Sequence, residues 1–254
     1  MKIATLSDLH LGKKSWNNFG QRKMEEVVAL KDINVLYFGG DLAEPDKENP
    51  EKGWDLFRQS LELMAASPAQ VKLFTLGNND LEQLQDAALT DHYAEMKKRV
   101  GEYGFHLLDD GPFIHEEIAF VGNVGWSDGT LWTPFAGKTT FPNSVETIRT
   151  RENLYFNRLT RKRAECLTSI DFYNHCKTRI ERDLDNVEKN DTVRGVIVGI
   201  HFVPDKSFVT SSSSKFNYLN WYMGAESHAK HYQHKKVIGG FTGHTHRSGM
   251  EQIG

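Results

Sequence analysis

The chain has 254 residues, 26% of them charged, and a formal net charge of −3. This slightly acidic balance excludes a protein whose whole surface grips nucleic acid, although it leaves room for a local basic patch. The sequence reaches Asp8 too early for the apolar core of a signal peptide, and no stretch approaches the roughly 20 apolar residues that span a membrane. We therefore expect a cytoplasmic protein without a membrane segment.

Short runs of β-branched and aromatic residues predict strands along the chain. These runs occupy residues 2–7, 34–40, 71–77, 118–125, 194–200 and 237–243. Between the first three runs the apolar residues follow helical spacing, most clearly at Trp54, Phe57 and Leu61, and a further helix is expected over 83–101. Strands that alternate with helices predict a layered α/β domain, in which ligands bind beyond the carboxyl ends of the strands.

The middle of the chain has a different pattern. Residues 127–157 are aromatic and polar without a clear period, whereas residues 158–190 are strongly charged and helix-like. We interpret the stretch around 127–190 as an inserted lid or helical segment. It would belong to one domain that spans residues 1–254, rather than form a domain of its own.

Five of the predicted strands end in residues that are able to bind metal ions. Along the chain these are Asp8 and His10; Asp41; Asn78, followed by Asn79 and Asp80; His201; and His244 with His246. Each signal alone has a plain alternative, because polar turns often follow strands and a lone histidine is often a core residue. The pair of histidines two residues apart is stronger, since such residues face the same way in extended chain. Together, in this order, the five ends indicate a shared metal site.

The order of these motifs, D-x-H, G-D, G-N-x-D, a lone His and G-H-x-H, resembles that of the calcineurin-like metallophosphoesterases, from residue 1 to about residue 247. The resemblance implies a layered α-β-β-α sandwich and two metal ions. It places Asp8, His10 and His246 on one ion, places Asn78, His201 and His244 on the other, and makes Asp41 the bridge between them. Imidazole and oxygen ligands suit Mn²⁺, with Fe, Zn or Co as alternatives, better than Ca²⁺ or Mg²⁺. The reaction implied is hydrolysis of a phosphoester by a hydroxide that bridges the two ions.

Asn79 is the point at which the chain departs from the family pattern. Most members carry there a histidine that protonates the leaving group, and asparagine cannot act as a general acid at neutral pH. Asp80, which would partner that histidine, is present without it. Losing a general acid typically costs on the order of 10²–10⁴ in rate, so we expect phosphodiesters with good leaving groups to be preferred. We regard Asp41, Asn78, Asn79 and Asp80 as the candidate catalytic residues.

Two other functions are open at this point. A phosphomonoesterase would need a substitute acid, for which His228, His231 and His234 are candidates, although a solvated polar surface is the simpler account of that cluster. A catalytically weak or inactive scaffold for protein interaction is the second alternative. The complete set of ligand positions argues against it.

The substrate class is suggested by aromatic residues that follow His201. They are Phe202, Phe208, Phe216, Tyr218, Trp221 and Tyr222. Aromatic side chains stack on bases at nucleic-acid sites, although core packing is their commoner role. A phosphoester derived from a nucleotide or a nucleic acid is therefore a hypothesis.

Overall fold

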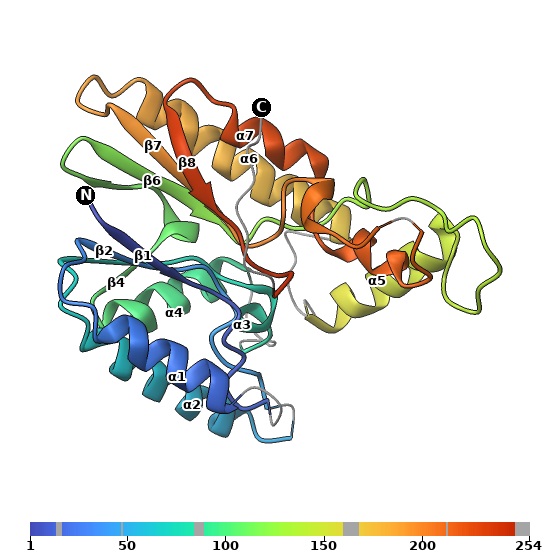
Figure 1. The fold of residues 1–254 in the computed structure, drawn as a ribbon, viewed down its shortest axis with the longest axis horizontal. Helices are drawn as coiled ribbons and strands as arrows, with labels where there is room; N and C mark the ends of the chain where they lie inside the picture. Colours follow the sequence, from blue (N-terminus) through green and yellow to red (C-terminus); the bar gives the residue numbers. More distant parts are fainter. Residues whose placement is uncertain (14–16, 47, 84–88, 160–167, 212, 247–254) are drawn as a thin grey trace.

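The computed structural model describes residues 1–254 except 14–16, 47, 84–88, 160–167, 212 and 247–254. The described strands form two four-stranded sheets that stack face to face (Figure 1). The first sheet contains, in this order and all parallel, β1 (Ile3–Leu6), β2 (Val35–Phe38), β3 (Val71–Phe74) and β4 (Phe105–Leu107). The second sheet contains β5 (Phe113–His115), β6 (Ile118–Asn123), β7 (Gly195–Ile200) and β8 (Val237–Phe241), of which only the β5–β6 pair is antiparallel.

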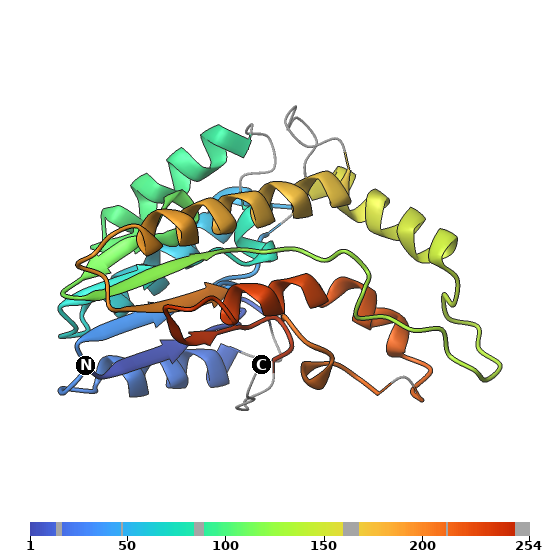
Figure 2. The ribbon, with the colours of Figure 1, turned by 90° about the horizontal axis from the view of Figure 1, so that it is seen from above.

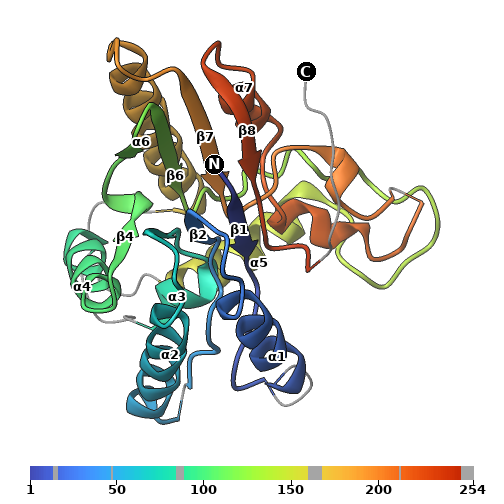
Figure 3. The same cartoon turned by 60° about the vertical axis from the view of Figure 1, so that its left-hand side comes forward.

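Helices cover the outer face of each sheet (Figures 1 and 3). Those against the first sheet are α1 (Asn17–Val28), α2 (Pro50–Ala65) and α4 (Leu89–Gly101), and those against the second are α6 (Ser169–Glu188) and α7 (Ala229–Tyr232). The remaining helices are α3 (Asn78–Glu82), α5 (Val145–Leu159) and the short 3₁₀ helices η1 (Leu108–Asp110), η2 (Lys206–Phe208), η3 (Asn217–Tyr222) and η4 (Glu226–His228). The predicted α-β-β-α sandwich is confirmed.

The strand β2 shows why its sequence is continuously apolar. Successive residues of a strand point to opposite faces. Val35 and Tyr37 belong to the cluster between the two sheets, whereas Leu36 and Phe38 pack with the helices on the outer face. Because both faces are covered, all four residues are buried, as expected for a parallel strand inside a layered sandwich.

The helix α2 follows directly from its sequence. The side chain of Asn49 accepts a hydrogen bond from the backbone of Lys52 and so caps the first turn, where Pro50 needs no donor of its own. Its apolar stripe buries Phe57 and Leu61 against the first sheet, as the helical spacing predicts.

Several elements differ from the sequence-based expectation. Strands β4 and β5 were not predicted, because three residues are too few to show an alternating pattern. The helix expected over 83–101 corresponds to α4, with residues 84–88 outside the described part. In the stretch without a clear period, α5 forms a regular helix.

The segment around α5 extends beyond the two sheets (Figure 2). It packs against η3 through a small cluster of Trp132, Ile148 and Trp221. In contrast, α6 lies on the outer face of the second sheet, so this part of the expected 127–190 insertion belongs to the sandwich. A lid function for the rest stays a prediction.

Among the helices that the structure describes, none combines the length and the apolar character required to cross a membrane. The cytoplasmic location stays a prediction.

Asp109 connects the two sheets close to the carboxyl ends of their strands. Its side chain is 1% exposed and accepts hydrogen bonds from the backbone N–H of Leu76, after β3, at 2.8 Å and of Val124, after β6, at 2.7 Å. The guanidinium of Arg179, on α6, donates to its backbone carbonyl. Burial raises the pKa of Asp109 to about 7 against the opposing effect of these donors. The carboxyl group thus links the loop that follows β3 in the first sheet to the loop that follows β6 in the second.

Replacing Asp109 should destabilise the protein in proportion to the donors left without an acceptor. Asp109→Ala strands two buried N–H groups and Asp109→Asn strands one, at about 1–3 kcal/mol for each group. Urea unfolding at pH 7 measures both costs. The adjacent Asp110→Ala removes only an exposed ion pair with Lys97 and should change stability by at most about 1 kcal/mol. An Asp109→Ala protein as stable as the Asp110→Ala control would contradict this account.

Candidate metal centre

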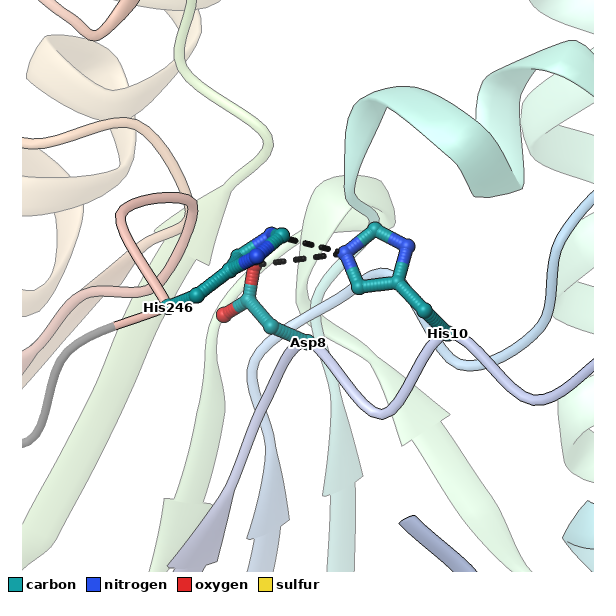
Figure 4. Close-up of side chains that lie close together, drawn as sticks. All are labelled: Asp8, His10 and His246. Carbon is teal, nitrogen blue, oxygen red and sulfur yellow. Dashed lines mark hydrogen bonds and ion pairs between the residues drawn. The ribbon is translucent and has the colours of Figure 1, made fainter. Parts of the chain in front are cut away.

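The predicted ligands meet at the carboxyl ends of the strands in two groups. The first group is Asp8, His10 and His246, and the second is Asp41, His201 and His244. Within each group the ligand atoms all lie within 4.8 Å of one another. Figure 4 shows the side chains of the first group directed toward a common point. Each group combines residues that follow strands of both sheets, so neither sheet could build a site alone.

Asp41 lies between the two groups. One of its carboxylate oxygens, Oδ2, is 3.6 Å from Nε2 of His10 in the first group and 3.5 Å from Nε2 of His201 in the second. The other oxygen accepts the backbone N–H of Asn79 at 2.8 Å. The side chain is fully buried. This placement agrees with the predicted bridging role, because one carboxylate faces both groups.

In three of the imidazoles, one ring nitrogen is hydrogen-bonded to a neighbouring oxygen atom. Nδ1 of His201 donates to the carbonyl oxygen of Gly39 at 2.7 Å, and Nε2 of His244 donates to that of Tyr222 at 3.1 Å. Nδ1 of His10 lies 2.8 Å from the carboxylate of Glu44. Because carbonyl and carboxylate oxygens only accept, each of these nitrogens carries the proton, and the opposite nitrogen faces the group with a lone pair.

The second group contains two such lone pairs close together. Nε2 of His201 and Nδ1 of His244 are 3.2 Å apart, which is stable only with a proton or another cation between them. Burial favours the neutral form of His201, but the charge of Asp41 outweighs it and raises the pKa to about 10. Burial, together with the charge of His201, lowers the pKa of His244 to about 3. A single proton shared by Nε2 of His201 and Nδ1 of His244 therefore lies where a metal ion would fit.

Asn78 supplies a further observation in favour of a metal. Its Nδ2 donates to Oδ1 of Asn79 at 2.9 Å and lies 3.5 Å from the hydroxyl of Tyr155, which reaches the site from α5. Its own Oδ1 is buried without a hydrogen-bond partner. A buried acceptor left unsatisfied is costly, and an oxygen donor of this kind is suited to a divalent cation. The donor set therefore fits metal binding.

The backbone at the ligands is strained. Among the described residues other than glycine, positive φ angles occur at Asp8 (55°), His10 (43°), Asp41 (59°), Glu116 (53°), His244 (69°) and His246 (54°). All but Glu116 are predicted metal ligands. L-residues avoid this region because the side chain approaches the backbone, and such strain concentrates at functional sites.

Two glycines allow the chain to pass the ligand carboxylates. A Cβ atom on Gly77 would lie 2.1 Å from Oδ1 of Asp41, and one on Gly243 would lie 2.6 Å from Oδ2 of Asp8. Both distances are far below van der Waals contact, so only glycine fits at these positions.

A family model described as calcineurin-like phosphoesterase matches residues 1–248. The chain belongs to this family. It is accordingly a metal-dependent phosphoester hydrolase. That the two ligand groups hold its divalent ions stays a prediction. The family predicted from the order of the motifs is confirmed.

The fold of this calcineurin-like phosphoesterase agrees with that of one solved structure, and a second solved structure is similar to a lesser degree. Phosphopantetheinyl hydrolase (PptH) from Mycobacterium tuberculosis is similar with a TM-score of 0.65 at 15% identity, over 98% of this chain and 85% of that chain. A dimetal phosphatase from Danio rerio is similar with a TM-score of 0.47 at 12% identity, over 96% of this chain and 81% of that chain. No curated protein matches the chain.

Asn79, which replaces the usual histidine of the calcineurin-like phosphoesterases, points into the metal centre. Besides accepting from Asn78, its side-chain amide lies 3.0 Å from Nδ1 of His10, so it contacts a predicted ligand of each ion. Asp80 is fully buried and accepts backbone hydrogen bonds from Gly77, Asp41 and Leu42. Burial and the charge of Asp41 raise the pKa of Asp80 to about 7. It holds the loops that carry the ligands together, and the catalytic roles of both residues stay predictions.

The three histidines considered as substitute acids lie in different surroundings. His228 and His231 are 1% and 3% exposed, so the expectation of a solvated surface was wrong for these two. Burial lowers the pKa of both, to about 3 for His231. His234 pairs with Glu188 at 2.8 Å. The first two are neutral at pH 7 and cannot supply a proton to a leaving group.

The aromatic residues after His201 serve mostly in packing. Phe202 is 3% exposed and stacks on the His244 ring at 4.2 Å between centroids, which fixes that imidazole. Trp221 is buried against Trp132, and its indole N–H donates to Glu152. Phe216 is exposed.

Two residues that contact the predicted ligands, Glu44 and Tyr155, were not predicted from the sequence, since neither follows a predicted strand at ligand spacing.

Relieving the strain at a ligand should separate stability from metal binding. In EDTA, His246→Gly should leave the free energy of unfolding unchanged or raise it by up to about 1 kcal/mol, because glycine adopts a positive φ without penalty. With Mn²⁺ present it should lose much of the stabilisation that bound metal gives the original protein, which is about 2.7 kcal/mol at a hundredfold excess over Kd. Urea unfolding in the two buffers measures both effects.

Glu116→Gly is the matched control, since it relieves the same strain in the turn between β5 and β6, away from the ligands. It should be stabilised equally in both buffers and keep the full response to Mn²⁺. An identical Mn²⁺ response of the two variants would rule out His246 as a ligand.

Proposed function

We propose that this phosphoesterase hydrolyses phosphodiesters in preference to phosphomonoesters, with two Mn²⁺ ions held by the predicted ligands. The observation that carries the proposal is the position of Asn79, whose amide lies among the predicted ligands where the family usually has its proton donor.

The ligand set favours binding of a phosphate group. Asp8, His10 and His246 would hold one ion; Asn78, His201 and His244 would hold the other; and Asp41 would contact both. When bound, such ions activate water for in-line attack and neutralise charge on the phosphoryl oxygens. Among the seven ligands only Asp8 and Asp41 carry a negative charge, so two divalent ions leave the centre net positive. An acidic chain can thereby attract an anionic substrate to this one place.

The preference for phosphodiesters follows from the lack, among the described residues of the predicted centre, of one that could protonate the leaving group. Asn79 has no proton to give at neutral pH, and the pKa values of His228 and His231 are lowered by burial. A leaving group must then depart without protonation, which favours esters whose leaving groups are already stabilised. A role for nucleobase stacking stays a hypothesis, because Phe202 and Trp221 are buried in packing contacts.

The comparison of two substrates tests the proposal. With Mn²⁺ supplied, kcat/KM for bis-(p-nitrophenyl) phosphate should exceed that for p-nitrophenyl phosphate. Asp41→Asn is the control and should lower the diester rate by about 100-fold or more, because even changes at groups that only orient a ligand cost 10–100-fold. A preference for the monoester that Asp41→Asn abolishes would overturn the diester assignment while keeping the metal centre.

Asn79→His should change the dependence on the leaving group. In the original chain we expect rates to fall steeply from p-nitrophenyl to phenyl esters, since the leaving oxygen receives no proton. A histidine at position 79 should raise the phenyl ester rate by at least about tenfold while changing the p-nitrophenyl rate little. The ratio of the two rates, measured for both proteins over pH 6–9, checks this. Equal ratios in the two proteins would show that position 79 does not face the leaving group.

A further inference from the structure

Glu44 is held beside the first ligand group by the backbone. The loops after β1 and β2 run parallel through a bridge between Leu11 and Ala43, and the backbone N–H of Glu44 donates to the carbonyl oxygen of Leu11 at 2.8 Å. This pairing fixes the start of the Glu44 side chain next to the loop that carries His10. The side chain is 30% exposed, so its position is not forced by core packing.

The Glu44 carboxylate contacts the nitrogen of His10 that faces away from the group. Oε1 lies 2.8 Å from Nδ1, and the ammonium of Lys13 lies 3.7 Å from the same oxygen. The carboxylate oxygen only accepts, so Nδ1 carries its proton toward Glu44. The Asn79 atom that lies 3.0 Å from Nδ1 is the amide nitrogen, itself a donor, which does not compete for that proton.

The opposite nitrogen of His10 is consequently the one offered to a metal. Nε2 lies 2.8 Å from Nε2 of His246, 3.6 Å from Oδ2 of Asp41 and 4.0 Å from Oδ1 of Asp8. Figure 4 shows one ring nitrogen of His10 directed at the other two side chains of the group and the second directed away from them.

We infer that Glu44 is a positioning residue for one of the two ions: it fixes the tautomer and the ring orientation of His10, so that Nε2 is presented to the ion shared with Asp8 and His246. The inference rests on the proposed two-metal function. In the second group the corresponding hydrogen bonds go to backbone carbonyls of Gly39 and Tyr222, which no substitution removes. Loss of Glu44 should therefore weaken the binding of only one ion, the one held by Asp8, His10 and His246.

Mn²⁺ titration, followed by electron paramagnetic resonance and calorimetry, tests this directly. The original protein should bind two ions, with the spectrum of a coupled pair at saturation. Glu44→Ala should raise the Kd of one ion by about 10–100-fold and change the Kd of the other by no more than about threefold. The uncoupled six-line spectrum of a single Mn²⁺ should therefore dominate at intermediate Mn²⁺ concentrations. Glu44→Gln should fall between the two, because an amide oxygen still accepts the N–H but lacks the charge.

Glu117→Gln is the matched control, since Glu117 is an exposed carboxylate paired with Arg194 at 2.8 Å and remote from the ligands in sequence. It should titrate as the original protein does. Equal weakening of both ions in Glu44→Ala, or no weakening of either, would overturn the role of Glu44 while the two-metal function stands. An original protein that binds fewer than two ions would overturn the two-metal function, and this inference with it.

Discussion

The relative placement of the two sheets is the constraint on which the metal centre depends. Each ligand group draws residues from both sheets, so a small shift between the sheets would separate the members of both groups. Tight contacts oppose such a shift near the ligands. A Cβ atom on Gly199 would lie 2.3 Å from the Tyr37 hydroxyl, and Asp109 accepts N–H groups from loops of both sheets. Packing between the sheets is thus also the means by which ligands are positioned.

The predicted metal centre is preorganised by hydrogen bonds that fix the orientation and the tautomer of its imidazoles. The imidazoles of His10, His201 and His244 are oriented by Glu44 and by two backbone carbonyls before any ion arrives. The two lone pairs of His201 and His244 converge at 3.2 Å, and, despite burial, the pKa of His201 is raised by the charge of Asp41 while that of His244 is lowered by burial, so the pair favours a single shared proton. A metal ion held by these residues would take the place of that proton, with the imidazoles already oriented toward it.

The sandwich could be predicted from the sequence because strand ends are local signals with a fixed chain order. The same signals predicted which side chains gather at the carboxyl ends of the strands, and their role as metal ligands stays a prediction. Strands β4 and β5 were too short to show a period, and α5 lies in a segment whose apolar residues face η3 instead of a sheet. Glu44 could not be found because its contact with His10 depends on how two loops run side by side. The burial of His228 and His231 is likewise set by the tertiary fold and not by their spacing.

The left-handed conformation of the ligand residues has a consequence for the life of the protein in a cell. Strain of roughly 1–2 kcal/mol at each such residue, at five of the predicted ligands, is large beside the total stability of about 5–15 kcal/mol typical of a folded protein. Bound metal compensates for that strain only while metal is plentiful. When supply falls, the metal-free chain should unfold more often and be degraded faster. Its abundance, as well as its activity, is therefore expected to follow the availability of the ion.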